Sequence, residues 1–150
     1  MANYKFDLTK SLSQLNKNLV PNGDASSRLV KRHNELLVKP IKDFSIEDLR
    51  LMIGQNTGLV YLIPVAMEHL RENILAEGDY YEGDLLKAVL TSDRGFWEKR
   101  TALRQQMLEI IKDQLAYLLD YPMNDQAKIE MVEAYQQFRA AAHALSGSHI

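Results

Sequence analysis

The sequence contains no cysteine. Disulfides, thiolate zinc sites and a cysteine nucleophile are therefore excluded, and the composition is compatible with a reducing cytoplasm. Long hydrophobic runs are missing too: the most apolar stretch, residues 58–67, has ten residues, half of the roughly 20 that a membrane-spanning helix needs. The chain also begins without the apolar segment of a signal peptide. We expect a cytoplasmic protein that makes no membrane contact.

Recognisable catalytic sequences are absent as well. There is no Gly-x-Ser-x-Gly turn for a serine nucleophile, and neither Gly54 nor Gly58 is followed by the Gly-Lys-Ser/Thr of a phosphate-binding loop. A di-iron bundle needs a glutamate three residues before a histidine, and none of the four histidines has one. We therefore expect no enzyme activity, no metal and no cofactor.

The residues that are present suit a small helical protein. The chain is 46% hydrophobic and 25% charged, which is typical of soluble globular domains and argues against disorder. No segment alternates polar and apolar residues for long enough to indicate a strand, whereas apolar residues recur at helical spacing. The pattern predicts an all-α fold, a single compact domain over residues 1–150 with about five to seven helices.

Several helix boundaries follow from local signals. Ser45 and Asp48 resemble a capping box at the start of one helix. A wide apolar face predicts a second helix from Leu59 to about Asn73. Asp84 is the expected N-cap of a short helix. One long helix is expected from Ser92 or Asp93 to about Leu119, and Asn124 is expected to cap a final helix.

Residues 76–86, AEGDYYEGDLL, contain Glu-Gly-Asp twice between two apolar segments. A metal or catalytic loop, an acidic surface for a basic partner and a charged turn between helices all fit this composition. A calcium loop is disfavoured because its oxygen ligands alternate along the chain before a distal glutamate, a spacing that this stretch lacks. Gly78 and Gly83 are expected to allow backbone angles that other residues resist.

Charge is distributed unevenly along the chain. Residues 1–40 hold seven Lys/Arg and three Asp/Glu, which gives +4, and residues 41–98 hold five and eleven, which gives −6. Residues 99–150 hold six of each. The acidic middle of the chain contains the Glu-Gly-Asp repeat, so this part of the sequence is the candidate for contact with a basic partner.

One stretch resembles a known family. It comprises Asp-Leu-Arg-Leu-x-Ile-Gly-Gln at residues 48–55, Gly-Leu at 58–59, Tyr-Leu-Ile-Pro at 61–64, Glu-Gly-Asp at 77–79, Tyr81, Gly-Asp-Leu-Leu at 83–86 and Trp97. In the order and spacing of these residues, the chain resembles the immunity proteins of bacterial contact-dependent growth inhibition (CDI), of the CdiI kind. The resemblance covers about 50 residues, with a best-recognised core at residues 45–98.

The resemblance implies a non-enzymatic inhibitor. Such a protein binds the C-terminal toxin domain of a cognate CdiA-type effector, and many of these toxins are nucleases; the more specific expectation is a ribonuclease of the EndoU class in a 1:1 complex. A nuclease has a basic cleft, so an acidic inhibitor would complement it and steer the encounter. No direct contact of this chain with nucleic acid is expected.

The candidate residues divide into two groups. Those expected to bind the toxin are acidic residues of the middle segment and one aromatic residue: Glu68, Glu72, Glu77, Asp79, Tyr80 and Glu82. Tyr80 is the expected anchor of the interface, and Tyr81 is the alternative anchor. Those expected to be structural occupy turn, cap or core positions: Pro64, Gly78, Gly83, Asp84 and Trp97. An ordinary solvated face is the alternative interpretation of the acidic residues.

Three other functions remain open at this point. The basic residues within 28–33 would suit a helical nucleic-acid-binding regulator, recognisable by an affinity that falls steeply with salt. A small hydrolase using the carboxylate-rich loop would lose its activity on Asp79→Asn. A scaffold subunit of a larger helical assembly is the third.

Overall fold

The computed structural model describes residues 4–147 and the side chains of residues 4–141. Within that part of the chain the fold is helical, with nine α-helices, one short 3-10 helix and no strand. The elements are α1 (Leu12–Leu15), α2 (Arg28–Leu37), η1 (Ile41–Asp43), α3 (Ile46–Gly54), α4 (Leu59–Glu72), α5 (Asp84–Leu90), α6 (Arg94–Glu98), α7 (Thr101–Asp113), α8 (Leu115–Asp120) and α9 (Asp125–Gly147). The all-α prediction is confirmed, although the described helices outnumber the expected five to seven.

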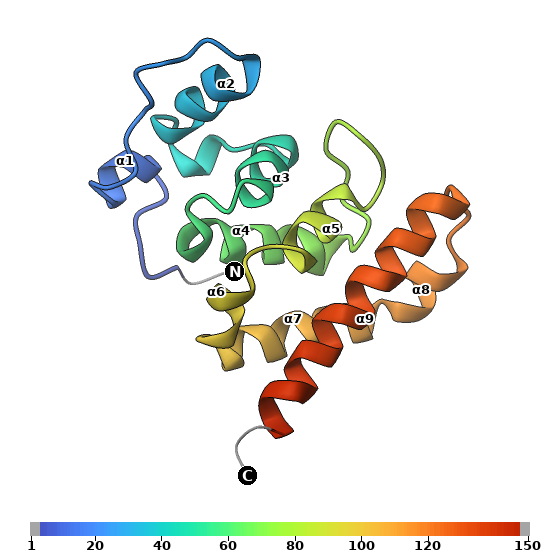
Figure 1. The fold of residues 1–150 in the computed structure, drawn as a ribbon. Helices are drawn as coiled ribbons and strands as arrows, with labels where there is room; N and C mark the ends of the chain where they lie inside the picture. Colours follow the sequence, from blue (N-terminus) through green and yellow to red (C-terminus); the bar gives the residue numbers. More distant parts are fainter. Residues whose placement is uncertain (1–3, 148–150) are drawn as a thin grey trace.

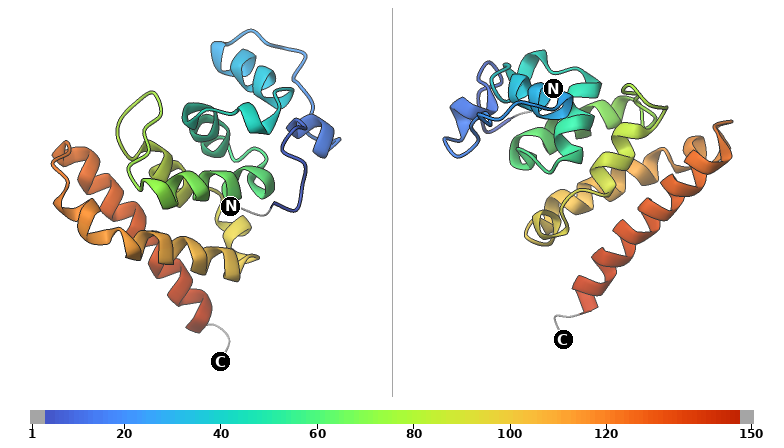
Figure 2. Two further views of the ribbon diagram at one scale, coloured as in Figure 1. Left: turned by 180° about the vertical axis from the view of Figure 1, so that it is seen from behind. Right: turned by 45° about the horizontal axis from the view of Figure 1, so that its top comes forward.

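Helices α3, α4 and α5 pack against one another at the centre of the molecule. Helix α2 packs on α3 and is itself contacted by α1, α7 packs on α4, and the long α9 crosses both α5 and α7 (Figure 1). The two further views in Figure 2 show α9 as a rod that extends away from the helices at the N-terminal end of the chain. The buried apolar side chains of these helices form one continuous cluster.

Short polar side chains begin five of the helices. Ser11, Ser27, Ser45 and Asp93 each accept a hydrogen bond from a backbone N–H in the first turn of α1, α2, α3 and α6, respectively. Asn124, the predicted cap of the final helix, accepts two such bonds from the first turn of α9. Each such cap stabilises its helix by about 1 kcal/mol. The capping box predicted at Ser45 is confirmed, because the Asp48 carboxylate also accepts from the Ser45 backbone N–H at 3.0 Å.

The apolar face predicted for α4 is confirmed in full. Its six inward residues are all buried: Leu59, Leu62, Ile63, Ala66, Met67 and Leu70. Pro64 lies inside this helix and is half-buried. Because proline has no backbone N–H, it removes one hydrogen bond from the helix interior, and packing of the apolar face against α3, α5 and α7 holds α4 together across that gap.

The single long helix expected up to Leu119 is wrong. The chain instead forms α6, α7 and α8, with breaks at Arg100 (φ −131°, ψ 63°) and Gln114 (φ −116°, ψ 12°). Gln114 marks the second break because its side chain is used elsewhere: its amide donates to the Leu70 carbonyl at 2.7 Å and accepts from the Ile74 backbone N–H at 2.9 Å. Contacts with the end of α4 therefore outweigh the helical periodicity here.

No helix in the described part of the chain is both long enough and apolar enough to cross a membrane.

Candidate functional site

The Glu-Gly-Asp repeat lies in the connection between α4 and α5, residues 73–83, here called the acidic loop. Its first part is anchored in the core, because Ile74, Leu75 and Ala76 are buried. Glu77 and Glu82 then form an isolated antiparallel bridge that closes the tip into a narrow turn. The bridge places Glu77 and Glu82 opposite each other on neighbouring stretches of chain.

Four of the six residues expected to contact a partner lie in the acidic loop. Glu77, Asp79 and Tyr80 are exposed, with Tyr80 at 70% of its maximal accessibility, and Glu82 is half-buried. Tyr81, the rival of Tyr80, is also half-buried. The structure thus presents one prominent aromatic side chain among three carboxylates.

The two expected residues of α4 are placed differently. Glu68 is paired with Arg71 on the same helix. Burial raises the pKa of Tyr4 above its ordinary value, and the negative charge of Glu68 raises it further. Glu72 is exposed at the last residue of α4, directly before the acidic loop. Glu72 therefore continues the acidic surface, whereas the charge of Glu68 is partly compensated.

Asp84 binds the backbone of the acidic loop. The side chain is buried, and its carboxylate accepts hydrogen bonds from the backbone N–H groups of Gly78 at 2.7 Å, Tyr80 at 3.1 Å and Tyr81 at 3.4 Å. The expectation that Asp84 is the N-cap of α5 is wrong. Gly83 occupies that position with φ +92°, a conformation that favours glycine, and this leaves the Asp84 carboxylate free to bind the loop.

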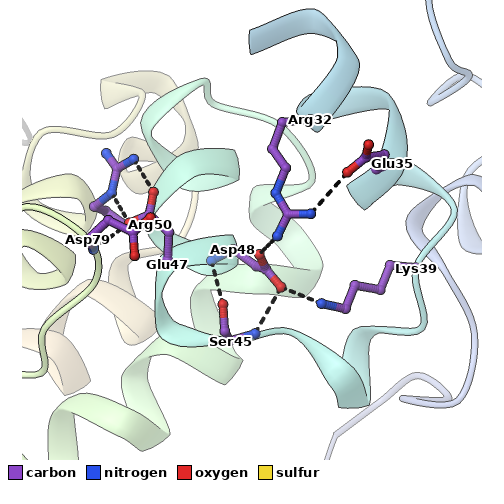
Figure 3. A network of polar contacts seen from close by, with 8 residues as sticks. All are labelled: Arg32, Glu35, Lys39, Ser45, Glu47, Asp48, Arg50 and Asp79. Carbon is purple, nitrogen blue, oxygen red and sulfur yellow. Dashed lines mark hydrogen bonds and ion pairs between the residues drawn. The ribbon is translucent and has the colours of Figure 1, made fainter. Parts of the chain in front are cut away.

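A second support comes from α3, a helix that the sequence did not connect with the loop. Glu47 accepts a hydrogen bond from the Asp79 backbone N–H at 2.9 Å and two from the Arg50 guanidinium, each at 2.6 Å (Figure 3). The hydrogen bonds from Arg50 keep the pKa of Glu47 below its ordinary value despite partial burial. The Arg50 guanidinium also lies 4.4 Å from the centre of the Tyr80 ring.

Gly78 is required by this arrangement for a different reason than expected. Its φ is not positive. A Cβ at this position would instead lie 2.6 Å from a carboxylate oxygen of Glu47 and 3.1 Å from one of Asp84. Any side chain here would displace the Glu47 carboxylate from its position beside the loop, so close approach rather than backbone angle explains this glycine.

The acidic loop also meets the end of α8. Interaction with the Glu82 carboxylate, and to a lesser extent the charge of Glu77, raises the pKa of Tyr121 above its ordinary value. Tyr117 lies next to Tyr121, with ring centroids 5.6 Å apart, and is exposed. These two tyrosines were not identified from the sequence, because they lie about 35 to 40 positions beyond the loop and nothing in their local pattern connects them with it.

Trp97, the remaining residue assigned to structure, is buried between helices. Its indole Nε1 donates to the Ser92 hydroxyl at 2.8 Å, and its ring makes edge-to-face contacts with Phe96 and Phe138 at 5.2 and 5.1 Å between centroids. It thereby connects α6 with α9.

The basic segment 28–33 is partly occupied by internal contacts. Arg32 pairs with Asp48 at 2.5 Å and with Glu35 at 3.1 Å, and His33 shares a hydrogen bond with the Thr57 hydroxyl at 2.8 Å (Figure 3 for Arg32). These contacts reduce the number of basic groups that α2 offers to a phosphate backbone. In the described residues, no group of three or more histidine, aspartate and glutamate side chains is arranged to hold a metal ion.

Comparison with known proteins gives one match. A family model described as CDI immunity proteins matches residues 14–107, which extends the resemblance on both sides of residues 48–97 and includes the acidic loop and both of its supports. No curated protein and no solved structure matches significantly. Because the matched segment covers well over half of the chain, this protein belongs to the family of CDI immunity proteins.

Proposed function

We propose that this immunity protein neutralises a nuclease toxin by covering its basic active-site cleft with the acidic loop. The proposed partner is the C-terminal domain of a cognate CdiA-type effector, specifically a ribonuclease of the EndoU class, bound 1:1. The observation that carries the proposal is the display of Glu77, Asp79 and Glu82 around one exposed tyrosine. The inhibitor itself is proposed to be non-enzymatic and to act in the cytoplasm, where a ribonuclease meets its substrate.

Charge complementarity supports this partner. A nuclease cleft must attract polyanionic substrate, so it is basic, and an acidic surface both accelerates the encounter and disfavours wrong partners. Part of the negative charge of residues 41–98 is compensated internally, for example that of Glu47 by Arg50. The exposed carboxylates of the acidic loop and Glu72 form no ion pair within the described residues and can face a partner.

The fixed backbone of the loop supports the proposal further. Binding by a mobile loop costs the free energy of ordering it, whereas a loop already held in place avoids that cost. Asp84 and Glu47 bind the backbone N–H groups of residues 78–81. The carboxylates at the surface therefore keep their positions before the toxin arrives.

Tyr80 is the proposed anchor. A few buried aromatic or arginine side chains usually carry most of the affinity of an interface, while charges at the rim add little. Tyr80 is exposed now and would be covered in the complex, and Arg50 already restrains its ring from one side. Tyr117, exposed at the far edge of the same surface, would extend the contact across α8.

The first experiment expresses the chain together with the toxin domain encoded immediately upstream of it and measures co-elution on size exclusion. The variant carries Glu77→Lys, Asp79→Lys and Glu82→Lys. Its matched control carries Asp24→Lys, Glu109→Lys and Asp113→Lys, three exposed positions outside the acidic loop with the same total change of charge. We expect a complex with the wild type and the control, and a weakened one with the loop variant.

The outcomes separate the role from its surface. A complex that is indifferent to the loop variant would retain toxin binding but contradict the acidic loop as its site. Failure of the wild type to bind the toxin, together with no rescue of cells that produce it, would contradict inhibition of that toxin.

A further inference from the structure

A second feature of the molecule lies at the opposite end of α5 from the acidic loop. There, the α5–α6 turn, α7 and α9 line a cavity of about 520 Å³ that is open to solvent on one side. This volume is in the range of small-molecule sites. The cavity is apolar over much of its lining, which includes Leu90, Trp97, Phe138 and Ala141.

Arg104 of α7 lines this cavity and is only 6% exposed. A guanidinium has five N–H donors, yet among residues 4–141 this one makes a single hydrogen bond, from Nη1 to the Trp97 carbonyl at 3.4 Å. No carboxylate in that part of the chain lies within 4.0 Å of it to form an ion pair. A buried charge without an opposite charge is costly, and residues 4–141 supply no counter-ion to Arg104.

Several other polar groups of the lining have partners within the protein. The Ser92 hydroxyl donates to the Val89 carbonyl at 2.6 Å and accepts from Trp97, and the Thr91 hydroxyl donates to the Lys87 carbonyl at 2.8 Å. Glu98, the carboxylate of the lining, is paired at 3.5 Å with Arg94. Among residues 4–141, Arg104 is therefore the buried cation of this lining that has no ion pair.

We propose that this cavity binds a small apolar carboxylate. Its carboxylate would accept hydrogen bonds from the Arg104 guanidinium, which suits planar two-oxygen acceptors. Its hydrocarbon body would lie against Trp97 and Phe138, where apolar burial adds to the affinity. This site is separate from the acidic loop, since α5 lies between them, and it does not depend on the identity of the toxin.

Trp97 provides a direct signal for the test, because it is the one tryptophan of the chain and lines the cavity. The full chain is titrated with octanoate, octanol and octylammonium while tryptophan fluorescence is recorded. We expect a saturable change with octanoate, and much weaker binding of the two compounds that have the same tail without the negative charge. Octanoate that binds no better than octanol, or gives no saturable change at millimolar concentration, would overturn the proposal.

Arg104→Met then tests the arginine itself. We expect octanoate to bind at least about tenfold more weakly, while the melting temperature without ligand does not fall, because an unpaired buried charge has been replaced by an apolar side chain of similar length. Arg100→Met is the matched control: Arg100 lies on the Phe96 ring outside the cavity lining, and its loss should leave octanoate binding unchanged. Unaltered octanoate affinity with a lowered melting temperature would assign Arg104 a purely structural role.

Ala141→Leu keeps the test valid if the arginine variant fails to fold. Ala141 is a half-buried member of the cavity lining, and a larger apolar side chain there would occupy the ligand's space without touching the charge. Octanoate binding that survives this filling would also contradict the proposed site.

Discussion

At the scale of single residues, Asp48 shows how a charge is accommodated inside this fold. Its side chain is 0% exposed, and the carboxylate receives Arg32 at 2.5 Å, Lys39 at 2.7 Å and the Ser45 backbone N–H at 3.0 Å (Figure 3). Burial raises the pKa of Asp48, but the hydrogen bonds from Lys39 and Ser45 and the charges of Lys39 and Arg32 outweigh it, so that the pKa lies below its ordinary value. One carboxylate thus joins α2, the following turn and α3.

Replacement of this carboxylate should destabilise the protein. Asp48→Asn removes the counter-ion of Lys39 and one of the two of Arg32, which keeps Glu35. We expect the free energy of unfolding to fall by about 2 kcal/mol, the lower end of the range for a broken buried pair, because both cations are partly exposed. Urea unfolding measures this loss. Asp43→Asn, which removes an exposed pair with Lys42, is the control and should change stability by less than about 1 kcal/mol.

The same substitution has a defined pH dependence. Because the pKa of Asp48 is lower in the folded than in the unfolded state, the unfolded chain takes up the proton first. The stabilisation is therefore present above the ordinary aspartate pKa of about 4 and is lost as the pH falls below it. The stability difference between wild type and Asp48→Asn should shrink on acidification from neutral pH, and a constant difference would contradict this account.

At the scale of elements, the acidic loop behaves as a part of α3 and α5 rather than as a free connection. Its backbone N–H groups are bound by Asp84, the first residue of α5, and by Glu47 of α3. The Arg50 guanidinium reaches both supports, at 2.6 Å from Glu47 and 4.0 Å from Asp84. Two helices therefore fix the position of the loop, and its order depends on their packing against each other.

Loss of one support should loosen the loop selectively. Asp84→Asn replaces a carboxylate that accepts three N–H groups by an amide with one acceptor oxygen. We expect amide hydrogen exchange at Gly78 and Tyr80 to accelerate by about tenfold or more, corresponding to the loss of about one hydrogen bond, with α7 unchanged. Exchange that accelerates equally throughout the chain would indicate global destabilisation instead, and Asp113→Asn serves as the exposed control.

At the scale of the whole molecule, charge is divided between surface and interior. The net charge is only −2. Two carboxylates of the acidic middle segment, those of Asp48 and Asp84, are buried in hydrogen-bonded positions. Of the remaining carboxylates of that segment, Glu72, Glu77, Asp79 and Glu82 lie together on the acidic loop and the end of α4, so this face is acidic although the total charge is nearly neutral.

An association steered by this face should depend on salt. We expect the association rate constant with the toxin domain to fall by about tenfold or more between low and high ionic strength, because exposed charges are screened within a few ångströms at high salt. The Glu77→Lys, Asp79→Lys and Glu82→Lys variant should show a much flatter dependence. Stopped-flow mixing at several salt concentrations measures both, and equal slopes for the two proteins would exclude steering by the loop.

Much of the fold was predictable because its signals are local. The inward face of α4, the capping box at Ser45 and the cap of α6 at Asp93 depend on residues within one or two helical turns of each other. The acidic loop was also found from the sequence, because its three carboxylates and two glycines, with Asp84 directly after them, stand between two apolar segments. Spacing, charge and the family resemblance supplied the class of fold and the immunity role.

The supports of that loop and the breaks in the later helices were decided by tertiary contacts alone. Asp79 meets Glu47 from 32 positions away, and Gln114 reaches back to Ile74 across 40. In the sequence, Arg104 cannot be distinguished from an exposed arginine of a helix, and only the packed structure shows that it is buried beside the cavity that α9 helps to line. A sequence pattern reflects the preferences of neighbouring residues, whereas these groups meet their partners only when distant helices pack together. Burial then decides the energetics, because a buried charge is stabilising when it is paired and costly when it is not.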